Sequence, residues 1–430
     1  MSSRRTQTGA SPRTESYERQ AASSELARDI NRDIVLEVLR RQQPIARVDL
    51  ARKCGLQRST VSAIVEGLIS ENWVREGSVV KTARGRRPTL LTLNADLAIL
   101  VADVRPSQAI LAVVDLNGRF LGRAIVPLIN DPKQGVNAMI AGMESLRSSF
   151  PNTIFEGIGI SLPGRVDKKT RRLLLAPNLG WTNFDIRQPI EDRMGLKVEL
   201  DNAANACLLS ELWFGHMEGL RDAVLITISE GVGTAILSNG QLVEGSSGLA
   251  GEFGHIPIDP SGPQCRCLAH GCWEMFASSR AALRFYSEQA PDGRATTIQE
   301  LINLEANGDQ AATAAIEKQA RFIGLGLRMI TASLNPQVIL FAGDITTCWR
   351  RSGPLIEEEV SRSLLAGDAP KLVPIGDGEL ARLRGAAALV LQKHAGYKRL
   401  QPDGRASADH QATKRLQMPR PGRAAEVKVR

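Results

Sequence analysis

The chain of 430 residues is 43% hydrophobic, which is enough apolar surface for two to four domains with buried cores and excludes a wholly disordered protein. It has no run of about 18 uncharged apolar residues, no apolar secretory signal and only 6 cysteines, so we expect a cytoplasmic protein without a membrane span or a disulfide scaffold. The net charge of +8 divides into +7 for residues 1–90, −5 for 91–397 and +6 for 398–430, which fits nucleic acid binding by the ends as well as two solvated termini.

Residues 1–27 and 398–430 are polar with little apolar periodicity, and we predict that both are disordered basic arms. Residues 28–90 contain three short helical patterns. The first begins at about Asn31 and ends at Pro44, the second spans 47–54 and ends at Gly55, and the third spans 57–68. Helix, glycine-containing turn and helix in this order predict a helix-turn-helix DNA-binding domain.

The third of these helices is the candidate recognition helix. Its apolar positions recur on one side, whereas small polar groups and one arginine cluster at its N-terminal side. Arg58 is the candidate base reader. The residues that we expect to contact bases or phosphates are Gln57, Arg58, Ser59, Thr60 and Ser62.

A wing and a basic strip follow the helices. Residues 73–77 and 79–81 predict a short hairpin, and Arg84, Arg86 and Arg87 follow it beside Gly85. These arginines suit DNA phosphates or a narrow minor groove. A single arginine of this kind is usually a solvated charge, but the whole series favours a winged helix-turn-helix.

From Leu97 onward the chain alternates between short runs rich in Val and Ile and helical stretches, which predicts an α/β body over residues 91–397. The first two strands are expected to form a hairpin. A body of this size can divide into two lobes with a cleft. The predicted strands are 97–103, 109–115, 157–161, 196–200, 223–229, 234–238 and 337–343, and the predicted helices are 135–149, 203–214, 274–290 and 310–334.

The sequence also indicates a metal site. His255, Cys265, Cys267 and Cys272 are ligand types that zinc prefers, and they lie within eighteen positions with turn-forming residues between them. Free thiols, redox chemistry or a disulfide are the alternatives. His270 could compete with His255 as the fourth ligand. We predict a structural Zn²⁺ site with His255.

Several stretches together resemble the ROK family, named for repressors, open reading frames and kinases. They are GLAGEFGH at 248–255, GPQCRCLAHGCWE at 262–274, SLPGR at 161–165, APNLGW at 176–181 and the winged helix that ends in GRRP at 85–88. The resemblance covers about residues 30–395, and its N-terminal part is similar to the repressor branch. It implies a two-lobed, actin-like ATPase (ribonuclease H-like) body, a sugar in the interlobe cleft and a zinc ion that shapes the sugar site.

The resemblance further implies the residues that hold the sugar. A buried sugar hydroxyl needs a donor or an acceptor, and carboxylates, an amide and an imidazole with one ring nitrogen on zinc would supply them. Each of these residues taken alone is more often a structural polar group. The implied set is Asn202, Glu252, His255 and Glu274, with Gly164 and Arg165 nearby.

The chain departs from the family's kinases at the nucleotide loops. The D-x-G-G-T loop has Arg105 and Pro106 in place of its glycines, Glu230 enters the second loop, and Asp344 enters the third. The N-D-A-N motif, whose aspartate is the kinase base, has Ala203 at that position, and the adjacent Asp201 is expected to project differently. We therefore expect no kinase activity and no nucleotide.

The sequence thus predicts a non-enzymatic, sugar-responsive transcriptional regulator, a repressor of carbohydrate-utilisation genes. Its expected partners are double-stranded operator DNA, a carbohydrate or carbohydrate-derivative effector, and further copies of itself in a homodimer or tetramer. The loss of an acceptor at Ala203 leaves open a ligand-independent regulator with a silenced cleft. A carbohydrate kinase that also binds DNA is the third alternative.

Overall fold

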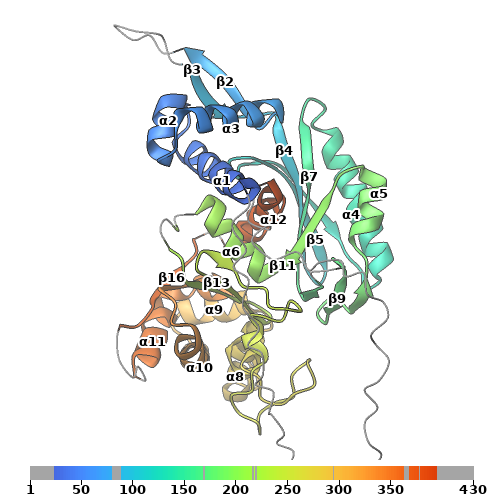
Figure 1. The fold of residues 1–430 in the computed structure, drawn as a ribbon. Coiled ribbons are helices and arrows are strands. Elements are labelled where there is room, and N and C mark those ends of the chain that lie inside the picture. The colour runs from blue at the N-terminus through green and yellow to red at the C-terminus, as the bar shows by residue number, and fades with distance from the viewer. Residues whose placement is uncertain are drawn as a thin grey trace, which may run out of the picture.

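The computed structural model describes residues 24–79, 89–167, 170–215, 217, 220–293, 295–362, 368–376 and 378–394. Apart from residues 24–27, the predicted disordered arms lie outside these ranges, and so do Arg84, Arg86 and Arg87. The described chain forms a small head and two larger lobes, with the head beside the first lobe (Figure 1). No helix within these ranges is long and apolar enough to cross a membrane.

The head contains three helices and a small antiparallel sheet. The apolar faces of the helices are buried against leucines of the sheet, as Val35, Val61 and Leu91 illustrate. Gly55 ends the second helix with φ at 67°, a conformation that glycine adopts at little steric cost. The elements are α1 (Ser24–Gln42), β1 (Ile45–Ala46), α2 (Arg47–Cys54), α3 (Arg58–Ser70), β2 (Val74–Val79) and β3 (Thr89–Leu93), with sheet order β1-β3-β2.

Two predictions for the head are wrong. Helix α1 begins at Ser24 and not near Asn31, because no glycine or proline interrupts the helix-forming residues before Asn31. The wing is not a hairpin of residues 73–77 and 79–81. Strand β2 runs on through Gly77 with a local register shift and pairs with β3, whose Leu91 and Leu93 are buried. Strand β3 therefore crosses the domain boundary predicted at residue 90.

The first lobe has a five-stranded sheet in the order β11-β7-β4-β5-β6. Every residue of β4 is buried, because both faces of the sheet are covered. Strands β4 and β5 are antiparallel, which confirms the predicted hairpin. The elements are β4 (Leu97–Val104), β5 (Gln108–Asp115), β6 (Phe120–Pro127), α4 (Pro132–Ser148), β7 (Ile154–Leu162), α5 (Arg187–Met194) and β11 (Val198–Asn202), with a small sheet of β8 (Arg165–Val166), β9 (Leu173–Ala176) and β10 (Trp181–Phe184).

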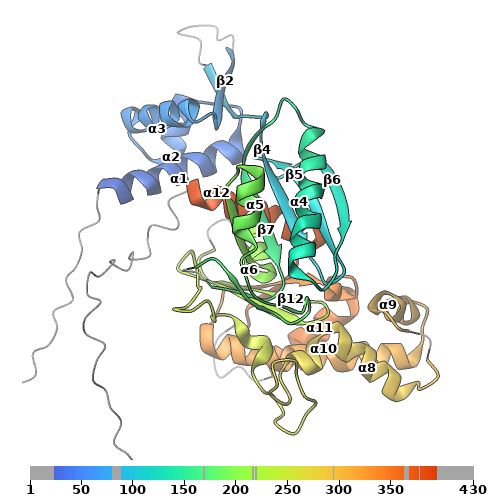
Figure 2. The ribbon, with the colours of Figure 1, turned by 90° about the vertical axis from the view of Figure 1, so that its right-hand side faces the viewer.

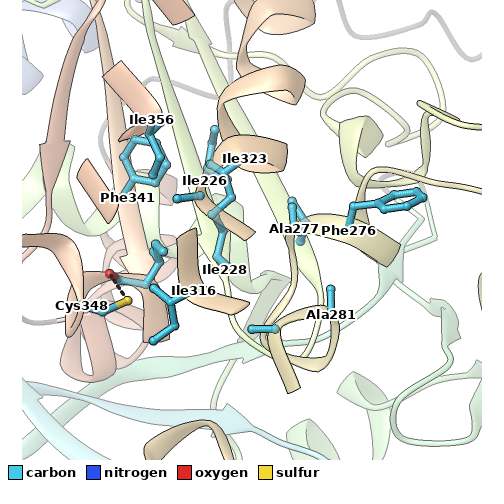
Figure 3. Close-up of a cluster of buried hydrophobic side chains, with 14 of the residues drawn as sticks. Ile226, Ile228, Phe276, Ala277, Ala281, Ile316, Ile323, Phe341, Cys348 and Ile356 are labelled. Carbon is cyan, nitrogen blue, oxygen red and sulfur yellow. Dashed lines mark hydrogen bonds between the residues drawn. The ribbon is translucent and has the colours of Figure 1, made fainter. Parts of the chain in front are cut away.

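The second lobe has a five-stranded sheet in the order β14-β13-β12-β15-β16. Helices pack on its outer face, and Figure 3 shows Ile226 and Phe341 of the sheet in the same apolar cluster as Ile323 and Ile356 of the helices. The elements are β12 (Ala223–Ile228), β13 (Val232–Ser238), β14 (Gln241–Leu242), η1 (Glu252–His255), α7 (Glu274–Ala277), α8 (Ser279–Gln289), α9 (Ile298–Ala306), α10 (Gln310–Leu334), β15 (Val338–Gly343), η2 (Asp344–Thr346), α11 (Trp349–Ser361) and β16 (Lys371–Pro374).

The single helix predicted over 274–290 is wrong, because α7 and α8 are separate. Ser278 between them has extended backbone, and its hydroxyl accepts a hydrogen bond from Ala281 N–H at the start of α8. A serine at this position caps the second helix and so ends the first.

Two helices fill the space between the lobes: α6 (Ala203–Phe214) and α12 (Gly378–His394). Helix α6 packs on β12 and β13, whereas α12 packs on β4 and β7, as Figure 2 shows. The two helices meet at Gly385, where a Cβ atom would lie 1.9 Å from the carbonyl oxygen of Ala206. Glycine at 385 is therefore required for this close helix crossing.

Candidate sugar and metal site and candidate DNA interface

Four side chains form a candidate metal cluster on the loop from η1 to the start of α7, residues 252–274, which is called the metal loop below. The ligand atoms of His255, Cys265, Cys267 and Cys272 all lie within 4.8 Å of one another. Cys265 Sγ is 3.6 Å from His255 Nδ1, and Cys267 Sγ is 3.5 Å from Cys272 Sγ. A tetrahedral zinc site with Zn–S bonds of about 2.3 Å has S···S separations of about 3.8 Å, so the donors fit zinc.

The cluster excludes two of the sequence-based alternatives. All six cysteines are free, and the separation between Cys267 and Cys272 is far beyond a disulfide bond of about 2.05 Å. His270 turns its Nδ1 to the carbonyl oxygen of Gly262 at 3.2 Å and does not join the cluster. In the metal-free chain burial raises the pKa of Cys272 to about 12, so metal binding must displace its proton.

Three predicted sugar residues lie next to this cluster on the second lobe. His255 directs Nδ1 to the cysteines, which leaves Nε2 on the other side of the ring, 3.9 Å from Glu252 Oε2. Glu274 is buried, and its Oε2 accepts a hydrogen bond from Val232 N–H at 3.1 Å. Its Oε1 lies 3.7 Å from Cys265 Sγ. Two carboxylates and an imidazole are thus held together by the metal loop.

The remaining predicted sugar residues lie on the first lobe. Strands β7 and β11 are parallel, and Asn202 at the end of β11 pairs in register with Leu162, next to the turn that contains Gly164. Asn202 caps α6, since its Oδ1 accepts a hydrogen bond from Asn205 N–H at 2.8 Å. The side-chain amide hydrogens of Asn202 can still donate to a ligand.

Ala203 begins α6, and the neighbouring Asp201 is held by hydrogen bonds within the chain. Asp201 is 3% exposed, and its Oδ1 accepts hydrogen bonds from the backbone N–H of Asn202 and from Asn205 Nδ2. This acid is therefore buried and bound to the start of α6.

Two arginines connect the lobes, and sequence reasoning found only one of them. Arg165, a predicted sugar residue, donates from Nη2 to the carbonyl oxygen of Ser247 at 3.4 Å. Arg266 stands between two cysteines of the cluster and donates from Nη1 to Asn178 Oδ1 on the first lobe. Asn178 lies in the APNLGW stretch, but nothing in the sequence pairs it with Arg266. The metal loop therefore also forms one wall of the interlobe boundary.

The altered nucleotide loops have their own internal contacts. The buried carboxylate of Asp103 accepts a hydrogen bond from Arg105 Nε at 2.8 Å and has Arg382 Nε at 3.9 Å. In the third loop, Asp344 Oδ2 accepts a hydrogen bond from the Ser279 hydroxyl at 2.7 Å. The second loop places Glu230 in the turn between β12 and β13. Arg105 and Asp103 thus pair within the first loop, and Asp344 of the third loop is bound to the start of α8.

The predicted recognition helix α3 exposes its polar end. Val61, Ile64, Val65 and Leu68 are buried, whereas the predicted DNA contacts are exposed or half-buried: Gln57, Arg58, Ser59, Thr60 and Ser62. The first turn of α3 contains no acidic residue that would repel a phosphate.

Ion pairs hold α3 in place within the head. Arg47 at the start of α2 binds Glu66 of α3 and Glu76 of β2, each at 2.7 Å. Arg32 of α1 binds Glu71 at the end of α3 through both of its terminal nitrogens. The arrangement fixes the orientation of the exposed end of α3 relative to the wing.

The head is joined to the body through α6. Arg40 of α1 lies over the rings of Trp213 and Phe214, with the guanidinium carbon 5.5 and 5.7 Å from the ring centres. Gln43 adds a hydrogen bond to Asn117 of the first lobe. The head core is also continuous with the sheet of that lobe, since Leu39 and Ile99 belong to one cluster. Sequence reasoning did not find this contact, because its partners are far apart along the chain.

Comparison with known proteins decides the family. The family model described as "ROK family" matches residues 103–393. The chain belongs to the ROK family.

Relatives within the ROK family include both regulators and kinases. The xylose repressor of Bacillus subtilis (strain 168) is 29% identical over 380 residues, which are 86% of this chain and 97% of the repressor. A solved ROK family transcriptional regulator, described as a homologue of the E. coli MLC protein, superposes with a TM-score of 0.74 at 26% identity and covers 87% of this chain and 98% of its own. A ROK glucokinase from Streptomyces griseus reaches a TM-score of 0.61 at 29% identity, over 69% of this chain and 99% of the kinase.

Proposed function

We propose that the protein is a DNA-binding transcriptional regulator, a repressor of carbohydrate-utilisation genes, whose cleft binds a carbohydrate or a carbohydrate derivative. The observation that carries the proposal is the exposed polar end of α3. The head that contains α3 packs onto a kinase-like body, in which Ala203 occupies the position of the kinase base. The similarity to a xylose repressor over most of the chain supports it.

The DNA contact would use α3 in the major groove, with Arg58 bound to a base edge and Ser59, Thr60 and Ser62 bound to bases or phosphates. Gln57 precedes the helix and is exposed beside them. Operators are read by symmetric pairs of heads, so a homodimer, or a tetramer made of dimers, would occupy two half-sites one helical turn or a multiple of it apart.

The sugar would lie between the lobes, held by Glu252, His255 and Glu274 on one side and by Asn202, Gly164 and Arg165 on the other. His255, Cys265, Cys267 and Cys272 would hold a structural Zn²⁺. When bound, zinc supplies a fixed point for the loop that carries the imidazole and, next to it, Glu274.

Helix α6 supplies a physical connection between the cleft and the head. Asn202 is its N-cap, and its last residues, Trp213 and Phe214, lie beneath the guanidinium group of Arg40. Residues 204–210 within it are all buried, so a shift at one end is transmitted through packed side chains. A ligand that binds two lobe arrangements with different affinity would thereby change the placement of the head.

Kinase activity is disfavoured by the contacts of the altered loops. Arg105 occupies the carboxylate of Asp103, and Asp344 is bound to Ser279. Absence of sugar-dependent ADP formation above a boiled control is the expected result. A regulator with a silenced cleft remains the second candidate, since Ala203 lacks the carboxylate that usually accepts a sugar hydroxyl.

Operator binding tests the proposal. Genomic fragments are selected with the purified full chain, and the affinity for the selected site is measured by fluorescence anisotropy for the natural protein, Arg58→Ala and the control Arg350→Ala. Arg350 is an exposed arginine of α11. We expect Arg58→Ala to weaken specific binding by about 1 to 3 kcal/mol and the control to bind normally. Equal binding by Arg58→Ala and the natural protein would contradict the assignment of α3.

A further inference from the structure

A cavity of about 210 Å³ lies between the metal loop and α8. Three of its lining residues are arginines, Arg266, Arg280 and Arg284, and one is an acid, Glu274. The other lining residues are uncharged: Gln264, Met275, Ser278 and Ala281. The cavity thus has more positive than negative groups on its walls.

Arg280 has the greatest unused capacity to donate hydrogen bonds. Its side chain is 35% exposed, and its Nη2 is 4.0 Å from Glu274 Oε1, beyond hydrogen-bonding distance. Among the described residues, its guanidinium has no hydrogen-bond partner. A guanidinium carries five N–H donors, and the long ion pair with Glu274 leaves them open to solvent or to a ligand. A ligand with oxygen acceptors could accept hydrogen bonds from them.

The other two cations are held in place around the same space. Arg284 donates from Nη2 to the carbonyl oxygen of Met275 at 2.6 Å, and its Nε lies 3.6 Å from Glu288 Oε1. Arg266 donates a hydrogen bond from Nη1 to Asn178 Oδ1. The arginines therefore approach the cavity from two elements, the metal loop and α8, and each retains N–H donors that these contacts do not use.

We propose that this cavity binds the anionic group of the effector, so that the effector is a sugar carrying a phosphate or a carboxylate and not a neutral sugar. The guanidinium group of arginine presents paired N–H donors, which form charge-assisted hydrogen bonds with two oxygens of a phosphate or carboxylate. The inference rests on the proposed function, because Glu274 lines the cavity and is also a residue of the proposed sugar site. It assigns Arg280 and Arg284 to ligand recognition, a role that the family resemblance did not imply.

Matched ligands test this proposal. Isothermal titration of the zinc-loaded full chain compares glucose with glucose 6-phosphate and glucuronate, xylose with xylose 5-phosphate, and inorganic phosphate alone. We expect one charged sugar to bind at least about tenfold more tightly than its neutral parent. The phosphate and carboxylate members distinguish the two possible anions, and inorganic phosphate shows what an isolated anion contributes.

Variants test whether the affinity for the charged sugar depends on the cavity. Arg280→Gln should lower the affinity for the charged sugar about tenfold or more and leave the affinity for its neutral parent unchanged. Arg280→Lys should retain part of the affinity for the charged sugar. The control Arg350→Gln removes the same overall charge from an exposed site on α11 and should have no effect. Circular dichroism of each variant confirms that it is folded.

Three results would overturn the anion site. They are neutral sugars that bind as tightly as their charged counterparts, an Arg280→Gln variant with unchanged affinity for the charged sugar, and inorganic phosphate that binds as tightly as any sugar phosphate. Each of these leaves the proposed regulator intact. If no sugar binds at all, both the anion site and the sugar-sensing part of the proposed function are wrong, while operator binding still tests the DNA-binding part.

Discussion

The contact between Arg40 and the end of α6 gives a quantitative prediction. Two ring faces lie 5.5 and 5.7 Å from the guanidinium carbon, within the distance at which a cation and an aromatic ring attract each other. Partly buried contacts of this kind contribute about 1 to 2 kcal/mol. Trp213→Leu keeps an apolar side chain but removes the larger ring, so we expect the free energy of unfolding to fall by about 2 kcal/mol.

A double-mutant cycle isolates the cation from the packing. Arg40 is half-buried, and this burial lowers its pKa to about 10. In an Arg40→Met background, Trp213→Leu removes no cation–ring contact, because the guanidinium group is already absent. The effects of the two substitutions on the free energy of unfolding should therefore be non-additive by about 1 kcal/mol. Urea unfolding of the four proteins measures this energy, and the same variants should weaken the response of operator affinity to ligand. Additivity within about 0.3 kcal/mol would refute the reasoning.

Three further predictions concern the metal, pH and catalysis. Cys267→Ser should lose stoichiometric zinc and melt at a lower temperature, because Cys267 is a candidate zinc ligand. The control Cys54→Ser, in the head, should keep its zinc. Retention of zinc by Cys267→Ser, measured by atomic absorption, would show that the ligand set is wrong. Burial and neighbouring acids raise the pKa of Asp33 from 3.8 to about 7, so its contribution to stability is full below pH 3.8 and is lost as the pH rises through 7. Asp33→Asn should therefore stabilise the protein in thermal melts at pH 8 but not at pH 4, and equal shifts at both values would contradict this. Ala203→Asp should strengthen sugar binding measured by calorimetry. The variant should still form no ADP from ATP, because the nucleotide loops remain altered, and measurable ADP would disprove the account of those loops.

Most of the strands that the sequence predicts have a continuous apolar run; the exception, 196–200, alternates between apolar and charged residues. Strand β4 is buried along its whole length and stands out for this reason. Strand β6 at the edge of the same sheet contains Gly122 and Arg123 and alternates between half-buried and exposed residues, so it carries no such run and was missed. The predicted hairpin pairs residues 73–77 with the wrong strand. The true partner of β2 is β3, which follows residues 80–88, and a local sequence pattern cannot reveal that pairing.

The cluster of candidate metal ligands could be predicted because these residues are close together in the sequence and chemically specific. Contacts across the molecule could not be. Arg266 with Asn178 and Arg105 with Asp103 depend on how the lobes and turns fold, which spacing does not encode. The role of Ala203 could be expected from a motif, but only the structure shows that Asp201 is buried and already hydrogen-bonded.

The measurement that tests the central claim most directly is the operator affinity of the full chain while the sugar that binds best is titrated. A ligand that distinguishes two lobe arrangements changes operator affinity, and the operator changes ligand affinity by the same factor. We expect a change of about 5-fold to 150-fold in the operator Kd as the cleft becomes saturated. A sugar that binds the protein while the operator Kd stays constant would contradict the account.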